Sequence, residues 1–204
     1  MSQRMLSLKT LVVGSSKVGK TALVKMFCSD GTDFPKQYLL THEYDLESKM
    51  MALQDNKGYV SFLLFDCSGR EVYEEFVVQT WKDACGVIVV YDVTDRESFE
   101  DTVRWGNQLR TKLGRKASNI PAVLVGNKRD LEERRVVSTE EGAARAKLMS
   151  CAFLECSSKN FEDVIEPFRL LALEATRLYD ERIGALDVMA ANMTWEDNEN
   201  DKDT

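Results

Sequence analysis

The residues Gly14–Thr21 (GSSKVGKT) fit the pattern GxxxxGK[ST], in which a glycine-rich loop binds phosphate. Glycines let the backbone wrap closely round a phosphate, and the N–H groups of such a loop and of the following helix start supply positive potential. We expect Lys20 to neutralise the β and γ phosphates and the Thr21 hydroxyl to bind Mg²⁺. The alternative is an ordinary glycine-rich turn, but a chance match in a chain of this length occurs about once in a hundred.

A second loop distinguishes guanine from adenine. Gly126 is followed by Asn127-Lys128-Arg129-Asp130, and the Asp130 carboxylate is able to accept both the ring N–H and the exocyclic amine of guanine. Adenine lacks those donors and would leave a buried charge unpaired. Lys128 is expected to lay its methylene stem along the base. Further along, Cys156-Ser157-Ser158-Lys159 is expected to offer a backbone N–H to the guanine oxygen.

Two more short segments complete a metal site. Asp66-Cys67-Ser68-Gly69 follows an apolar stretch, and an aspartate there is suited to hold Mg²⁺ through water. Gly69 would let its N–H approach the γ-phosphate. Thr41 lies in a polar segment, where its hydroxyl is expected to complete the metal shell when GTP is bound. Each of these signals is weak alone. Their order along the chain, together with the two loops above, predicts a site for a guanine nucleotide with Mg²⁺.

Alternating strands and helices would bring these loops to one edge of a sheet. Apolar runs predict five buried strands, and between them helical spacing predicts four helices. The expected fold is an α/β sheet of six strands, mostly parallel with one antiparallel edge strand, and with helices on both faces. The antiparallel strand is Leu46–Leu53, joined to Tyr59–Phe65 by a turn at residues 55–58. The other predicted strands are Leu8–Val13, Val87–Tyr91, Ala122–Val125 and Ala152–Glu155, and the helices are Lys20–Cys28, Val72–Ala84, Ser98–Leu113 and Thr139–Met149.

Composition narrows the class of ligand. The 204 residues carry a net charge of −7, which argues against broad nucleic-acid affinity. Five cysteines without a CxxC pair and a single histidine argue against a zinc site, and they are typical of reduced thiols in a cytosolic protein. Proteins and small molecules therefore remain as the expected classes of binding partner.

Together these motifs resemble the Ras superfamily of small GTPases over about residues 6–180, and its Rab branch in particular. Phe34, seven residues before Thr41, stands where that family has an aromatic beside the base, and Ser16 is Rab-like. The resemblance implies GTP or GDP with Mg²⁺ and two nucleotide-dependent switch segments, near Phe34–Tyr44 and Asp66–Trp81. The residues expected to bind the nucleotide are Gly14, Ser15, Ser16, Lys17, Val18, Gly19, Lys20, Thr21, Ala22, Phe34, Gly69, Asn127, Lys128, Asp130, Ser157, Ser158 and Lys159. The expected catalytic residues are Lys20, Thr41 and Gly69, and the expected metal ligands are Thr21, Thr41 and Asp66.

One position departs from the family pattern. The residue after Gly69, where small GTPases carry the glutamine that orients the attacking water, is Arg70. We therefore expect slow hydrolysis, at or below about 10⁻⁴ s⁻¹. The alternative is that Arg70 acts as an arginine finger in cis.

The C-terminal part of the sequence also departs from the family pattern. The sequence ends NENDKDT and offers no cysteine for a lipid anchor, so none is expected. A helical apolar stripe runs from Phe168 to Met189, beyond the expected domain, and an uncovered stripe favours a partner protein. We expect a domain over residues 6–180, a partner-binding helix over 181–192 and an acidic disordered tail over 193–204.

In its missing switch glutamine, its missing lipid site and its C-terminal helix, the chain resembles the Rab-like GTPase subunits of the intraflagellar transport B complex. The resemblance implies a heterodimer with a small β-sandwich subunit, contacts with other subunits, a possible effector surface at the switches, and location in the cytoplasm and in a cilium or flagellum. The alternatives are a conventional vesicle-trafficking Rab, a nucleotide-bound scaffold, and a P-loop kinase or ATPase that binds adenine nucleotide.

Overall fold

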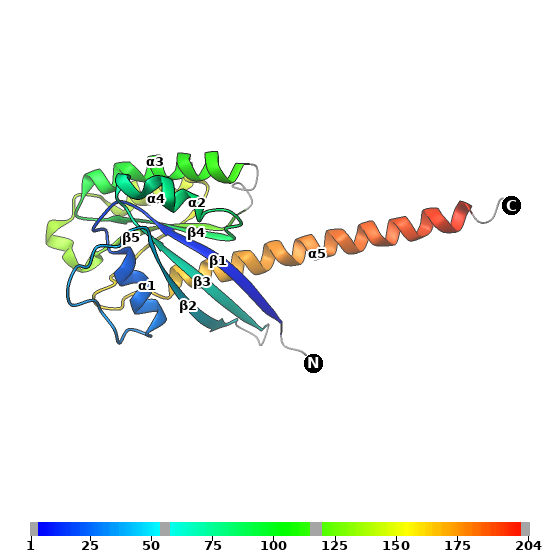
Figure 1. Cartoon of the computed structure of the whole chain (residues 1–204), viewed down its shortest axis with the longest axis horizontal. Coiled ribbons are helices and arrows are strands. Elements are labelled where there is room, and N and C mark those ends of the chain that lie inside the picture. Colours follow the sequence, from blue (N-terminus) through cyan, green and yellow to red (C-terminus); the bar gives the residue numbers. More distant parts are fainter. Residues whose placement is uncertain (1–3, 54–57, 115–119, 201–204) are drawn as a thin grey trace.

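A computed structural model of the chain describes residues 4–53, 58–114 and 120–200, with side chains described as far as residue 186. It contains a six-stranded sheet in the order β2-β3-β1-β4-β5-β6, and helices cover both faces (Figure 1). All neighbouring strands are parallel except the edge pair β2 and β3. The predicted fold class, including the antiparallel edge strand, is confirmed. The strands are β1 (Met5–Val13), β2 (Tyr44–Ala52), β3 (Tyr59–Cys67), β4 (Gly86–Asp92), β5 (Ala122–Asn127) and β6 (Ala152–Glu155).

The helices form two layers with separate cores. One core packs α1 and α5 against the sheet, and the other packs α2, α3 and α4 against the opposite face. Apolar side chains of β1, β4 and β5 contribute to both cores, which is why these strands are apolar along most of their length. The helices are α1 (Lys20–Cys28), α2 (Glu74–Gln79), α3 (Arg96–Leu113), α4 (Thr139–Met149) and α5 (Glu166–Asn200), and two 3₁₀ segments are η2 (Glu71–Tyr73) and η4 (Arg129–Arg134).

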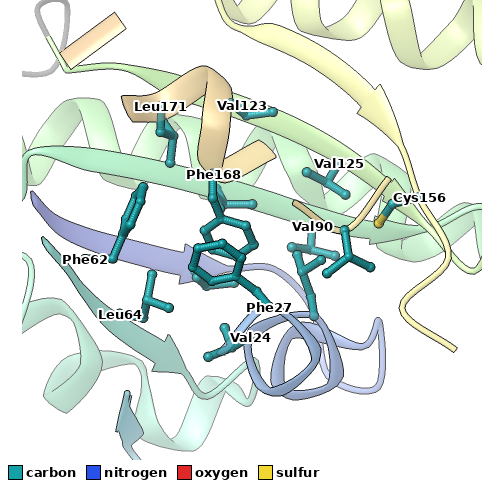
Figure 2. Close-up of a cluster of buried hydrophobic side chains, with 14 of the residues drawn as sticks. Val24, Phe27, Phe62, Leu64, Val90, Val123, Val125, Cys156, Phe168 and Leu171 are labelled. Carbon is teal, nitrogen blue, oxygen red and sulfur yellow. The ribbon is translucent and has the colours of Figure 1, made fainter. Parts of the chain in front are cut away.

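Aromatic rings pack α5 against α1. Phe168 of α5 stacks on Phe27 of α1 with ring centroids 3.7 Å apart, and Phe62 of β3 meets both rings edge-on (Figure 2). All three rings are buried. The helix α1 directly follows the phosphate-binding loop. This packing therefore fixes the position of the C-terminal end of that loop.

Side chains at the helix starts explain where α3 and α4 begin. The Asp95 carboxylate accepts the N–H groups of Glu97 and Ser98, and Ser138 forms a reciprocal capping box with Glu141. The prediction of a helix over Val72–Ala84 was wrong in length. The structure has η2 and the six-residue α2 there, because the N–H groups of Thr80 and Trp81 bond to the carbonyls three residues back, of Val77 and Val78, and the chain continues as a turn.

The hairpin turn is only partly within the described residues. The Leu53 N–H donates to the Gly58 carbonyl at 2.9 Å, which closes the connection between β2 and β3, while residues 54–57 lie outside the described part. Gly58 has φ of 112°, a conformation that favours glycine.

The last helix extends well past the sheet. In Figure 1, α5 projects away from the domain, and its assigned span continues to Asn200, into the range where an acidic tail is expected. The division at residues 180 and 192 therefore stays a prediction, and residues 201–204 lie outside the described part. Within residues 4–53, 58–114 and 120–200, none of the helices has the length and apolar character needed to cross a membrane.

Candidate nucleotide-binding site

The glycines of the loop after β1 are required by its close packing. Gly14 has φ of 143°, and a Cβ there would lie 2.1 Å from the Val90 carbonyl oxygen. Gly19 has φ of 97°, and a Cβ there would meet the Asn127 amide at 2.3 Å. Any side chain at either position would strain the backbone and displace a neighbouring strand or loop. The sequence thus folds here into a closely packed glycine loop, the kind of loop whose backbone N–H groups bind phosphate.

Lys20 is held inside this loop. Its ammonium donates to the carbonyl oxygens of Gly14 and Ser15, both at 2.8 Å, and the residue is only 7% exposed. Burial lowers the pKa of Lys20 to about 8, against the opposing effect of the Asp66 charge. A phosphate group beside the ammonium would favour its charged form and reverse this shift.

The three expected metal ligands meet at one point. The Thr21 hydroxyl donates to Asp66 Oδ2 at 2.5 Å and lies 3.3 Å from the Thr41 hydroxyl. Burial raises the pKa of Asp66 to about 6, and its Oδ1 atom is buried without a hydrogen-bond partner among the described residues. A buried carboxylate oxygen without a donor is a good ligand position for a hard cation, so this donor set fits Mg²⁺.

Asn127 joins the guanine side to the phosphate loop. Its amide N–H donates to the Val18 carbonyl at 2.9 Å, and its Oδ1 accepts from the Ser158 hydroxyl at 3.0 Å and from the Ser158 N–H at 3.2 Å. The residue is 1% exposed. One side chain therefore holds together three loops that follow β1, β5 and β6.

Lys128 and Asp130 lie on either side of this junction. Lys128 has φ of 66° and donates from Nζ to the Lys17 carbonyl at 2.8 Å, so its stem extends beside the phosphate loop. Asp130 accepts from the Ser157 hydroxyl at 2.7 Å through one carboxylate oxygen. That contact orients the carboxylate and leaves its other oxygen to accept donors from a base.

The loop after β6 is closed on itself. Ser157 and Glu162 exchange two backbone hydrogen bonds, at 3.0 and 3.1 Å, and Lys159 is exposed between them. The structure thus places the expected residues Ser157, Ser158 and Lys159 beside the Asn127–Asp130 loop.

The first switch segment covers the phosphate loop. A pocket between them is lined by residues that include Phe34, Thr41, Thr21, Ala22 and Gly69. The lining does not include the side chains of Asn127 and Lys128, which donate to the carbonyl oxygens of Val18 and Lys17 in the phosphate loop.

The second switch segment begins in direct contact with the phosphate loop. A Cβ on Gly69 would lie 2.5 Å from the Gly14 carbonyl oxygen, the Ser15 carbonyl carbon and the Ser16 nitrogen, so only glycine fits. Arg70 follows in extended conformation and is exposed, and its guanidinium has no hydrogen bond or ion pair among the described residues. Arg70 therefore points its charge to solvent next to the expected phosphate position.

Sequence reasoning missed several supporting residues. The Tyr38 hydroxyl lies 3.1 Å from the Ser16 hydroxyl, across the pocket. Asp92 forms a 2.6 Å ion pair with Lys128, and Asp101 of α3 accepts from the Ser15 hydroxyl. The position of Asp92 at the end of a predicted strand was a usable signal for a site residue. No local pattern indicated Asp101 or Tyr38.

Comparison with known proteins agrees with this geometry. A family model described as the Ras family matches residues 9–177. The chain therefore belongs to the Ras family, a family of guanine-nucleotide-binding small GTPases that typically use Mg²⁺.

Within that family, several relatives carry the name Intraflagellar transport protein 27 homolog. The human protein is 36% identical over 91% of this chain and 98% of its own length, and the Mus musculus protein is 35% identical over 87% and 95%. The Trypanosoma brucei brucei protein is 34% identical over 90% and 98%. The resemblance to Rab-like GTPases of intraflagellar transport is thereby confirmed.

Proposed function

We propose that this chain is a GTP- and GDP-binding, Rab-like small GTPase that acts as a subunit of an intraflagellar transport complex in a cilium or flagellum. The observation that carries the nucleotide part is the contact of Asn127 with both the phosphate loop and the loop after β6. The names of relatives that match nearly the full chain support the transport part.

The proposed roles follow from the contacts. Lys20 neutralises the β and γ phosphates, and Asp130 with Lys128 binds the guanine base. Thr21, Thr41 and Asp66 hold Mg²⁺, which when bound neutralises phosphate charge. Gly69 brings its backbone N–H to the γ-phosphate because its missing side chain permits that approach.

Hydrolysis is proposed to be slow because Arg70 stands beside the reacting phosphate. A guanidinium has donors only, so it offers no acceptor to orient an attacking water. We expect single-turnover hydrolysis at or below about 10⁻⁴ s⁻¹ for the wild type. Arg70→Gln is expected to be about tenfold faster, which corresponds to about 1.4 kcal/mol in the barrier.

The matched control for that experiment is Glu71→Gln, which changes the charge of the exposed neighbour and leaves Arg70 in place. It should hydrolyse GTP at the wild-type rate. A wild type much faster than Arg70→Gln would contradict the proposal and support an arginine finger in cis.

The transport role requires a partner, and we propose the small β-sandwich subunit of the same complex, bound along the projecting part of α5. Ile183 and Leu186 lie three residues apart on α5, beyond Tyr179, whose ring contacts Arg4, and both are more than two-fifths exposed. An apolar stripe with no sheet beneath it is suited to bind another protein.

A charge placed on this stripe tests the partner assignment. Ile183→Asp should abolish co-purification with the co-expressed β-sandwich subunit while leaving guanine nucleotide binding intact, since the residues of α5 that pack in the core with α1 end at Ala175. Gly184→Asp adds the same charge one position away from the stripe and should preserve the complex. Equal co-purification of both variants would contradict this interface.

A further inference from the structure

The first turn of α2 is connected to the phosphate loop through side chains of α3. Glu74, the first residue of α2, accepts a hydrogen bond from Arg104 Nη1 at 2.8 Å and another from Gln108 Nε2. Both donors come from α3. The carboxylate therefore binds the start of α2 to that helix.

The same arginine also reaches the phosphate loop. Arg104 Nη2 lies 3.5 Å from Asp101 Oδ2, and that oxygen accepts the Ser15 hydroxyl at 2.6 Å. The carbonyl of Ser15 in turn accepts from the Lys20 ammonium. A continuous set of polar contacts thus runs from Glu74 to the lysine expected to hold the phosphates.

These contacts lie in a setting that favours a defined geometry. The side chains of Glu74, Asp101 and Arg104 are between 29% and 34% exposed, so solvent screens their charges less than it screens a fully exposed pair. The Arg104 guanidinium also lies 5.0 Å from the centre of the Trp105 ring, which is buried against the sheet. This ring restricts where the guanidinium sits.

The segment before Glu74 is held at Gly69 and at Tyr73, whose ring packs against the core. Gly69 packs directly on the phosphate loop, and η2, which follows Arg70, contains no buried residue. Near the nucleotide site, the described attachments of the second switch thus include the backbone packing at Gly69, the Tyr73 hydroxyl 3.0 Å from His42 Nδ1, and the polar contacts at Glu74.

We propose that Asp101, Arg104 and Gln108 are positioning residues that couple the placement of α2 to the phosphate loop. Nucleotide retention then depends on Glu74, although Glu74 is not among the residues expected to touch the nucleotide. This inference rests on the proposed binding of guanine nucleotide.

The test is the dissociation rate of fluorescently labelled GDP from the full chain in the presence of excess unlabelled GDP and Mg²⁺. Glu74→Gln keeps the shape of the side chain and removes its charge, and it should release GDP about 2- to 5-fold faster than wild type. Glu75→Gln is the matched control, because Glu75 is the exposed neighbour in the same helical turn, and it should release GDP at the wild-type rate.

A double-mutant cycle separates coupling from general destabilisation. Ser15→Ala removes the contact with Asp101 at the other end of the connection. If the two ends are coupled, the rate increase in Ser15→Ala/Glu74→Gln is smaller than the product of the two single increases. Arg104→Lys retains the charge but loses the forked geometry, and it serves in place of Glu74→Gln should that variant not fold.

Equal rates for Glu74→Gln and Glu75→Gln would overturn the inference, and so would single-variant effects that simply multiply. A wild type that retains no guanine nucleotide would overturn both the inference and the proposed function. A wild type that retains GDP, with Glu74→Gln unchanged, would overturn the inference alone.

Discussion

The guanine-side loops and the switch segments border the same edge of the sheet, yet they are held by different kinds of contact. Asn127 is buried and makes hydrogen bonds to two other loops. In the first switch, Tyr38 is 61% exposed and Leu39 is 73% exposed, and Tyr38 reaches the phosphate loop through a single hydroxyl contact. The Asn127 junction of the guanine side is thus part of the core, whereas the first switch depends on side chains that remain in contact with solvent.

Base recognition should therefore show the largest effect of a single substitution. Asp130→Asn replaces one of the two acceptor oxygens by an NH₂ donor, so one of the two guanine donors, the ring N–H or the amine, faces another donor. We expect GTP affinity to fall roughly 10³-fold, measured by equilibrium titration. Xanthine nucleotide, which carries a carbonyl in place of that amine, should bind the variant better than it binds wild type.

The control is Glu133→Gln, a charge change at an exposed position of η4. It should leave GTP affinity within about twofold of wild type, as surface changes usually do. Unchanged GTP affinity in Asp130→Asn would mean that this carboxylate does not read the base.

The second prediction concerns stability. Asn127→Ala leaves the Val18 carbonyl and the Ser158 N–H without their buried partner, and it should lower the free energy of unfolding by about 2 kcal/mol. Urea unfolding with nucleotide removed from both proteins measures this. Asn160→Ala, at an exposed position of the loop after β6, should change stability by less than about 0.5 kcal/mol. Equal losses in the two variants would contradict the view that the guanine side is fixed by the core.

A substitution in the first switch should have the smallest effect on nucleotide binding. Tyr38→Phe removes the hydroxyl that faces Ser16, and because the ring is mostly exposed we expect GDP dissociation to rise by about twofold or less. Tyr44→Phe, which alters a partly exposed hydroxyl on β2, is the control and should leave the rate unchanged. A tenfold increase in Tyr38→Phe would show that the first switch is held as firmly as the guanine side.

The elements that carry the motifs were largely predictable from the sequence. The bounds of Lys20–Cys28, Thr139–Met149 and Ala152–Glu155 agree with the structure, because apolar spacing and capping residues act locally. The length of α2 was not predictable, since the backbone changes to i→i−3 hydrogen bonds at Thr80 and Trp81 although the apolar spacing continues. Periodicity alone does not report that change.

The site was predictable where a motif fixes the backbone and hidden where side chains from distant elements meet. Glycines at positions 14, 19 and 69 signal close approaches that the packing confirms. The contact between Ser15 and Asp101 joins residues 86 positions apart, and no sequence pattern pairs them. Such contacts depend on how α3 lies on the sheet, which only the folded chain determines.

The most direct test of the whole account is the identity of the nucleotide that copurifies with the full chain. Denaturing the purified protein and separating the released nucleotide by ion-exchange chromatography gives both its base and its amount. The account predicts GDP or GTP, close to one per chain. Adenine nucleotide, or an empty protein that does not take up added GTP with Mg²⁺, would contradict it.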